Sequence, residues 1–240
     1  MRRELTEWQL LDMWEAGHRQ APPARALLLA AAVAPSGATV ADLPLAELKA
    51  LQLDLRERSF GTVLPCVTDC PGCGESLEVS VMTDELRAPG QRKAPGDGPE
   101  LGTLHAEGCK VTYRALTGRD LLAVHGASGK VRRTLLRRCV VGSEPADSDL
   151  PDVVLEALAE RLADHDPGAD TVLSLTCPHC RHAWTAALDV AEHLWAEVEA
   201  YARRLLYEVH ALARAYGWSE ADVLAVSPLR RQFYLGAATG

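Results

Sequence analysis

Two Cys-Pro-x-Cys turns, far apart in the sequence, constrain the fold of this chain more than any other feature. The first occupies residues 70–73 (CPGC) and the second residues 177–180 (CPHC), and apolar residues alternate with others after each turn. Two such turns that face each other supply four thiolates in a tetrahedron, which suits Zn²⁺. The sequence therefore predicts one zinc ribbon, split by an insertion of about a hundred residues, around a structural zinc ion. The predicted ligands are Cys70, Cys73, Cys177 and Cys180.

Other uses of these cysteines stay open at the level of sequence. A CxxC motif can be a redox pair because it lowers a thiol pKa, although two copies that each lead into a strand fit redox chemistry poorly. A disulfide framework is disfavoured because seven cysteines is an odd number and no secretory context is evident. Unligated thiols are the third alternative. His179 and His182 are either substitute ligands or polar neighbours, and Cys66, Cys109 and Cys139 are expected to be buried like apolar side chains.

Composition narrows the class of protein. Hydrophobic residues make up 48% of the chain and charged residues 24%, as in soluble globular proteins. The formal net charge of −8 argues against nucleic acid as a partner, because a general nucleic-acid binder presents a basic stripe. Residues 24–34 (ARALLLAAAVA) resemble the apolar core of a signal peptide, but acidic residues precede them and the run is too short to span a bilayer. We therefore expect a buried helix here, no membrane partner and a cytoplasmic protein.

The apolar periodicity predicts an α+β fold, mainly helical, with a small antiparallel zinc ribbon split by the long insertion. Residues 1–60 are expected to form an N-terminal helical unit. The two halves of the ribbon are expected at residues 61–83 and 171–188. Between them, residues 84–170 form the insertion, with a loop, a hairpin and helices. Residues 189–240 are expected to hold the longest helix of the chain, followed by short helices.

Side chains that cap helices mark several boundaries. Asp42 and Asp189 are predicted to cap the helices that follow them. Thr117 and Ser219 each begin a capping box, in which an acidic residue three positions later completes the pattern. These four positions predict where helices begin before any tertiary contact is known.

The insertion combines flexible and ordered segments. Residues 87–102 are rich in Pro and Gly, which predicts a flexible surface loop. Residues 103–114 alternate around a short turn and predict a hairpin. Residues 142–149 are polar and acidic and are expected to form another loop.

Three charged motifs in the insertion invite functional interpretations. Residues 125–130 (HGASGK) lack the first glycine of a phosphate loop and have Val131 where its hydroxyl residue belongs, so a turn between helices is expected. Residues 129–140 predict a basic helix, and we favour a solvated face over a patch for an acidic partner. Residues 164–166 (DHD) are expected to be a loop with capping side chains and not a metal or catalytic cluster.

The helix that begins after Asp189 is apolar over more than one face. Its main stripe recurs every three or four residues, and Trp195, Leu206 and Trp218 lie partly outside it. Such a helix must be buried on more than one side. Either the N-terminal helices cover every side, or the surplus face packs against another protein through aromatic anchors. The candidate partner-binding residues are Trp195, Tyr201, Leu206, Trp218, Phe233 and Tyr234.

Most of the chain, including its helical N-terminus, resembles a known protein family, and the resemblance is most specific in two segments. They are residues 60–82, which begin FGTVLPCVTDCPGCGESLEVSV, and residues 175–235, in which HLWAEVEAYARRLLYEVHALARAYGWSE is the most specific part. The chain resembles the baseplate hub assembly chaperone family of T-even-like phages, in the version carried by bacterial contractile injection systems. The resemblance implies a role in building or forming a tail baseplate, with hub, spike or wedge components as partners. It leaves open whether the protein stays in the assembled tail-like particle. Phage relatives need not carry the cysteines, so the zinc prediction rests on their spacing alone.

The motifs agree with a non-enzymatic protein that has no small-molecule substrate. The sequence contains no HExxH, no phosphate loop, no nucleophile elbow and no dinucleotide-binding fingerprint. A zinc-ribbon adaptor in a nucleic-acid or regulatory complex is the alternative, which the acidic balance disfavours. A metal-dependent enzyme is a weaker alternative, because four sulfurs leave no open position on the metal.

Overall fold

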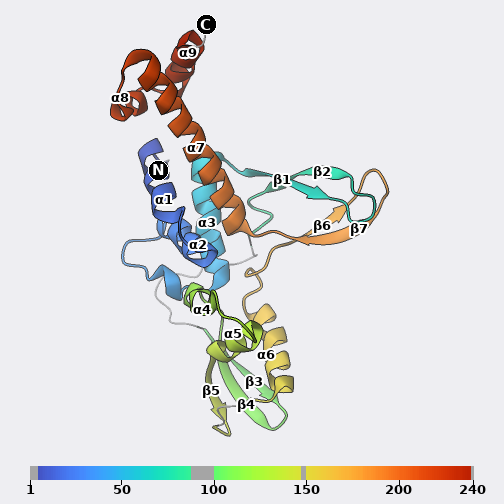
Figure 1. The fold of residues 1–240 in the computed structure, drawn as a ribbon. Coiled ribbons are helices and arrows are strands. Elements are labelled where there is room, and N and C mark those ends of the chain that lie inside the picture. Colours follow the sequence, from blue (N-terminus) through green and yellow to red (C-terminus); the bar gives the residue numbers. More distant parts are fainter. Residues whose placement is uncertain (1–4, 88–99, 147–149, 239–240) are drawn as a thin grey trace.

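The computed structural model describes residues 5–87, 100–146 and 150–238 of the chain. Within these ranges the fold is α+β, as predicted, with many helices and small antiparallel sheets. Figure 1 shows a central helical layer, with strands extending to one side and smaller lobes above and below it. Residues 88–99 of the segment predicted to be a loop at 87–102 lie outside the described residues, and the prediction is wrong at its end, where Leu101 and Gly102 belong to a strand.

Four helices form the central layer. Helices α1 (Glu7–Gly17), α2 (Pro22–Ala31) and α3 (Leu45–Phe60) pack around the first half of α7 (Val190–Tyr216). Their apolar faces meet in one buried core, which contains Leu10, Met13, Leu29, Leu55, Leu194, Trp195 and Val198. The apolar run that imitates a signal peptide is therefore a packed helix and the turn after it. The predicted N-cap of α7 is also confirmed, because Asp189 accepts a hydrogen bond from the Glu192 N–H at 3.1 Å.

Trp195 lies inside this core, with only 2% of its surface exposed. Its ring lies against Gly17, where a Cβ atom would overlap both the ring and a methyl group of Leu28. The guanidinium of Arg25 lies 4.9 Å from the ring centroid, a cation–π contact. The prediction that Trp195 anchors a partner is therefore wrong, because the N-terminal helices cover this side of α7.

We expect the substitution Gly17→Ala to destabilise the central layer. The new Cβ must displace the Trp195 ring or Leu28, and overpacking of this kind costs about 1–3 kcal/mol. Gly236→Ala is the matched control, since nothing lies within 4 Å of a Cβ at that helical position. The measurement is the urea midpoint of unfolding for both variants. Equal midpoints would show that the contact with Trp195 imposes no restriction.

The start of α3 differs from the sequence prediction. Asp42 does not cap the helix, because it lies in a short 3₁₀ helix, η1 (Val40–Asp42), and pairs with Arg119. Pro44 has a non-helical backbone conformation, with φ −53° and ψ 152°, so the helix begins at Leu45. Asp166, which comes from the far end of the insertion, caps α3 instead and accepts the Ala46 N–H at 3.2 Å. Asp166 therefore does supply a capping side chain, as predicted for residues 164–166, but to a helix 120 residues away. The prediction of a loop is wrong for Asp164 and His165, which form the end of a helix.

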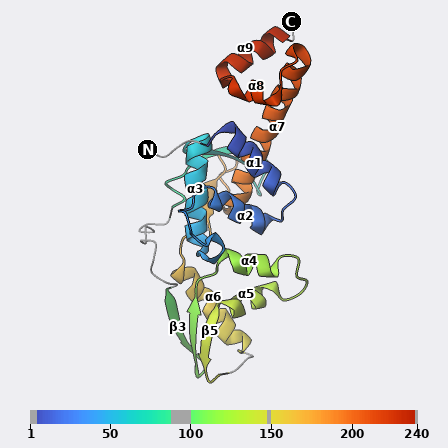
Figure 2. The same cartoon turned by 90° about the vertical axis from the view of Figure 1, so that its left-hand side faces the viewer.

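The insertion folds into its own small lobe. Strands β3 (Leu101–Ala106), β4 (Cys109–Arg114) and β5 (Val140–Glu144) form an antiparallel sheet in that order. The predicted hairpin is thus confirmed, whereas the predicted loop at residues 142–149 is wrong at its start, where Gly142–Glu144 extend the sheet. Figure 2 shows this sheet at the bottom of the molecule, below the central helices.

The described residues of the insertion form three helices, of which the last two cover the sheet and supply the rest of its core, while the first packs against the second and against α2. They are α4 (Gly118–Val124), α5 (Val131–Cys139) and α6 (Asp152–His165). The capping box predicted at Thr117 is present, with Asp120 as its second member. The core of the lobe includes Val111, Cys139, Val154, Leu155 and Leu158, which are all nearly inaccessible to solvent.

Three of the four arginines of α5 pair with acidic residues within the lobe. Arg132 pairs with Glu156 and Arg133 with Asp152, both on α6. Arg138 donates to the fully buried carboxylate of Asp120 at 2.9 Å. The basic helix is therefore neither a freely solvated face nor a patch left open for an acidic partner, because its charges hold α4, α5 and α6 together.

The second half of α7 carries a C-terminal helical lobe. Helices α8 (Glu220–Ala225) and α9 (Pro228–Ala238) fold back onto α7, as Figure 2 shows above the central layer. The capping box predicted at Ser219 is present and begins α8. The buried guanidinium of Arg231 donates to the Glu7 carboxylate at 2.6 and 2.8 Å and to Glu208 at 2.7 Å. This ionic network ties α9 to α7 and to the first helix of the chain.

Candidate metal centre

Two β-hairpins form an arm that projects from the central layer. One pairs β1 (Val63–Asp69) with β2 (Ser76–Met82), and the other pairs β6 (Val172–Thr176) with β7 (Ala183–Ala187). The two hairpins are separate two-stranded sheets, so no backbone ladder joins them. At the root of the arm, both hairpins pack on α3 and α7 through a core that contains Leu53, Leu64, Val81, Val190, Leu173 and Leu188. Figure 1 shows the two hairpins side by side on the right of the molecule.

The first hairpin ends in a tight knuckle that contains two cysteines. The Cys70 N–H donates to the Glu75 carbonyl at 2.8 Å, and the Gly74 N–H donates to the Cys70 carbonyl at 2.8 Å. Gly74 has φ +75°, a left-handed conformation that glycine adopts without strain. The turn brings Cys73 close to Cys70 at the tip of the hairpin.

The second knuckle repeats this geometry with different residues. The Cys177 N–H donates to the His182 carbonyl at 2.9 Å, and the Arg181 N–H donates to the Cys177 carbonyl at 2.9 Å. Arg181 occupies the left-handed position, with φ +61°, that Gly74 occupies in the first knuckle. A side chain in this conformation is strained, so the second knuckle holds a conformation that its sequence does not favour.

The two knuckles bring four sulfur atoms together, and these atoms could hold a metal ion. All four Sγ atoms lie within 4.8 Å of one another. The Cys70 and Cys180 sulfurs are 3.6 Å apart, and those of Cys73 and Cys177 are 3.7 Å apart. Cys70 and Cys177 are buried whereas Cys73 and Cys180 are exposed, so the cluster has an inner and an outer side. The cysteine ligand set predicted from the sequence is therefore assembled in space.

Electrostatic repulsion opposes the ionisation of all four thiols when no cation lies between them. The N–H groups of Cys180 and His179 stabilise the Cys177 thiolate and lower the pKa of this thiol to about 7. The Glu75 N–H has the same effect on Cys73, but desolvation and the neighbouring sulfurs outweigh it and raise the pKa of Cys73 to about 12. Four thiolates cannot ionise together at this distance unless a positive charge lies between them.

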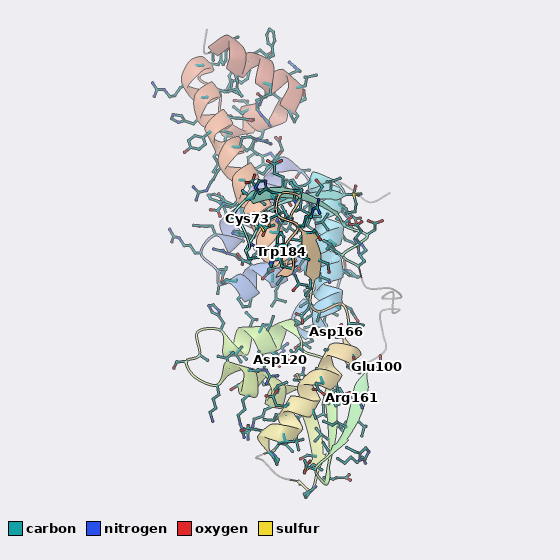
Figure 3. The ribbon with its side chains drawn as sticks, turned by 90° about the vertical axis from the view of Figure 1, so that its right-hand side faces the viewer. Cys73, Glu100, Asp120, Arg161, Asp166 and Trp184 are labelled. Atoms are coloured by element: carbon teal, nitrogen blue, oxygen red, sulfur yellow. The ribbon has the colours of Figure 1, made fainter. Side chains whose placement is uncertain are left out.

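The histidines near the knuckles are neighbours of the sulfur cluster. Within the described residues, the group of donor atoms close enough to share one metal consists of the four cysteines and includes neither His179 nor His182. The His182 ring lies against Gly72, where a Cβ atom would come within 3.0 Å of it, and stacks on Trp184 at 6.1 Å. Figure 3 labels Cys73 and Trp184 in this part of the arm. The interpretation of both histidines as polar neighbours agrees with this arrangement.

The three other cysteines lie in apolar surroundings away from the cluster. Cys139 is fully buried in the insertion core, and burial raises the pKa of its thiol to about 12. Cys66 is half-buried at the root of the arm, where desolvation also raises its pKa. Cys109 packs half-buried against the insertion core. All three behave as the apolar-like cysteines that the sequence predicts, although two of them keep some exposure.

The predicted partner-binding residues separate into an interior group and a second group, which we call the exposed group because it contains the 74% exposed Phe233, although Trp218 and Tyr234 are half-buried. Tyr201 is half-buried and donates its hydroxyl to Glu7 at 3.0 Å, and Leu206 is half-buried against the small core beneath α8. Like Trp195, these two residues mainly make contacts within the chain. Trp218, Phe233 and Tyr234 instead meet at the free end of the C-terminal lobe.

The prediction missed two residues of the exposed group. Tyr216 stacks on Trp218, with ring centroids 5.2 Å apart. Leu229 is 85% exposed. The signal for Leu229 was its spacing of four residues from Phe233, which places both side chains on one face of a helix.

Comparison of the chain with protein-family models, with curated proteins and with solved structures gives no match in any of the three. Among the helices of the described segments, none combines the length and the apolar character needed to cross a membrane.

Proposed function

We propose that this chain is a non-enzymatic structural or assembly protein of the baseplate of a contractile, phage-tail-like injection system. The observation that carries the proposal is the resemblance of residues 60–82 and 175–235 to the baseplate hub assembly chaperone family. These segments, in which the resemblance is most specific, are far apart in sequence, yet together they include β1, β2, the end of β6, β7, α7, α8 and most of α9. Both segments therefore contribute to the arm. The site of action is the bacterial cytoplasm and the particle assembled there.

We further propose that the sulfur cluster holds one structural Zn²⁺ ion. Zinc bound to cysteine has Zn–S distances of about 2.3 Å, so the sulfurs of a regular tetrahedron lie about 3.8 Å apart. The two distances of 3.6 and 3.7 Å between knuckles are close to this value. Four thiolates close the coordination shell, which supports a structural metal over a catalytic one. Since the hairpins share no ladder, zinc would act as the clasp between them.

The shape of the molecule suits a protein that contacts several neighbours. The arm, the insertion lobe and the C-terminal lobe extend from the central helices in different directions (Figures 1 and 2). The insertion lobe has its own core, whereas the arm and the C-terminal lobe pack on the central helices through shared cores, so each lobe presents a surface at a defined position. Hub, spike or wedge components of the baseplate are the proposed partners.

Deletion of the gene tests the proposal. We expect a host strain without this chain to produce no complete contractile particles, and the intact gene supplied in trans to restore them. Electron microscopy of purified particle fractions measures the outcome, and mass spectrometry of the restored particles shows whether the chain remains in them. Normal yields of complete particles from the deletion strain would overturn the proposed function.

A further inference from the structure

The outer face of α9 is apolar and uncovered within the described residues. Leu229 and Phe233, one turn apart, are 85% and 74% exposed, and the exposed Gly236 and Ala237 continue the same stripe. The opposite face of α9 carries the buried Arg231, which packs toward α7. The helix is therefore apolar on the side that its own chain leaves open, which marks a surface for interaction.

Aromatic rings extend this stripe to the end of α7. The Tyr234 ring lies 6.0 Å from Phe233, 5.1 Å from Trp218 and 6.0 Å from Tyr216, each in an edge-to-face arrangement. The Tyr216 hydroxyl also donates to the Tyr234 carbonyl at 3.2 Å, which fixes the end of α7 against α9. We call Tyr216, Trp218, Leu229 and Phe233, together with the intervening Tyr234, the tip surface. Large, ordered aromatic side chains are the residues that most often dominate binding energy at protein interfaces.

The exposed charges beside the tip surface include two arginines, although the chain as a whole has a net charge of −8. Arg230 is exposed and lies three residues before Phe233 on α9, and Arg214 is exposed two residues before Tyr216. A complementary partner presents carboxylates around an apolar pocket. A second copy docked through the same surface would oppose arginine to arginine, so charge disfavours self-association here.

The tip surface is held in place before any partner arrives. The ionic network of Arg231 with Glu7 and Glu208 fixes the inner face of α9, and the Gln232 side-chain amide donates to Glu208 at 3.0 Å. Rigid presentation lowers the entropy lost on binding, so a small surface can bind specifically.

We propose that the tip surface docks another protein through an apolar pocket bordered by aspartate or glutamate. The proposal deepens the proposed function and rests on it in one respect, since the partner would then be another baseplate protein. Phe233 and Leu229 enter the pocket, and Arg230 and Arg214 pair with the carboxylates at its border.

A photo-crosslinking experiment in the native host tests this docking. The full-length chain carries p-benzoylphenylalanine in place of Phe233, and a matched chain carries it in place of Val67, which is similarly exposed (71%) but lies on the arm. We expect Phe233 to cross-link to a segment of a different protein that contains apolar residues next to aspartate or glutamate. Arg214→Glu with Arg230→Glu should lower the cross-link yield about tenfold, whereas Arg161→Glu on α6 should leave it unchanged.

A second measurement uses the cross-linked partner segment as a synthetic peptide. Phe233→Ala should weaken its binding to the purified chain about thirtyfold, as expected for an aromatic anchor.

Cross-links from position 233 to a second copy of this chain, to lipid or to nucleic acid would overturn the proposal. So would a yield no higher than at position 67 in cells that contain the folded protein. Loss of particles in the deletion strain without a cross-link at position 233 refutes the docking alone, while a cross-link together with normal particles in the deletion strain refutes only the baseplate function.

Discussion

Cys177→Ser should release the proposed zinc ion and destabilise the whole molecule, because one thiolate of the proposed clasp is lost and the two hairpins share no ladder. Structural zinc sites in small domains contribute about 10–16 kcal/mol to folding at pH 7. Even a loss of about 4 kcal/mol lowers Tm by roughly 8–16 °C in a chain of this size. The measurements are the zinc content of the purified protein and its thermal unfolding.

Cys109→Ser provides the matched control for this experiment. Cys109 is half-buried and lies outside the sulfur cluster, so the same change of sulfur to oxygen should leave the zinc content unaltered. A strong chelator should lower the Tm of the wild-type protein and of Cys109→Ser, but should not lower that of Cys177→Ser further. Wild-type protein that is purified without zinc, with all four thiols freely titratable in the folded state, would contradict the assignment.

Arg231→Met should detach α9 from the central layer. The substitution keeps the volume of the side chain but leaves the carboxylates of Glu7 and Glu208 without their cation. Breaking a buried ion pair in this way typically costs about 3–5 kcal/mol. Urea unfolding measures the loss, and hydrogen exchange should show faster exchange throughout α9. Arg203→Met is the control, because Arg203 is 64% exposed in its pair with Glu199 and such pairs contribute only about 0.3–0.5 kcal/mol.

The same network predicts a loss of stability in acid. Burial would raise the pKa of Glu7, but hydrogen bonds and attraction from Arg231 outweigh it and hold this pKa below the ordinary value of a glutamate. A depressed carboxylate pKa stabilises the fold at pH values above the unfolded-state pKa, and this contribution disappears as the pH falls through the folded-state pKa. Glu7→Gln should therefore reduce the acid dependence of stability below about pH 4.5. An unchanged pH profile in this variant would show that Glu7 is not the group responsible.

The features predicted correctly from the sequence are those whose partners lie within a few residues. The caps at Asp189, Thr117 and Ser219 involve residues three positions away, so their signal is local. The cysteine cluster joins distant segments, but both segments carry the same Cys-Pro-x-Cys motif, so the sequence predicts that they share one metal site. The α+β fold class follows in the same way from periodicity within each segment.

The errors arise where a distant residue decides the outcome. Asp42 looks like a helix cap, but Asp166 from the far end of the insertion takes that place. From the sequence, Trp195 is predicted to be exposed apolar surface. In the structure its ring packs in the space that the missing side chain of Gly17 leaves. The polar sequence of β5 does not predict a strand by itself, and these residues form one because they hydrogen-bond to β4 in an antiparallel pair. No periodicity within a segment encodes these pairings.

The ionic network between α1 and α9 has a consequence for how this chain is made. Glu7 and Arg231 are separated by 224 residues, so their ion pair cannot form until nearly the whole described chain has been synthesised. The sulfur cluster also forms late, because Cys73 and Cys177 are 104 residues apart. At a translation rate of about 5–20 residues per second, Cys70 and Cys73 hold an incomplete ligand set for roughly 5–20 s. Capture of the proposed zinc ion would therefore come late in synthesis, and a ribosome product that stops before residue 177 would lack two of the four ligands.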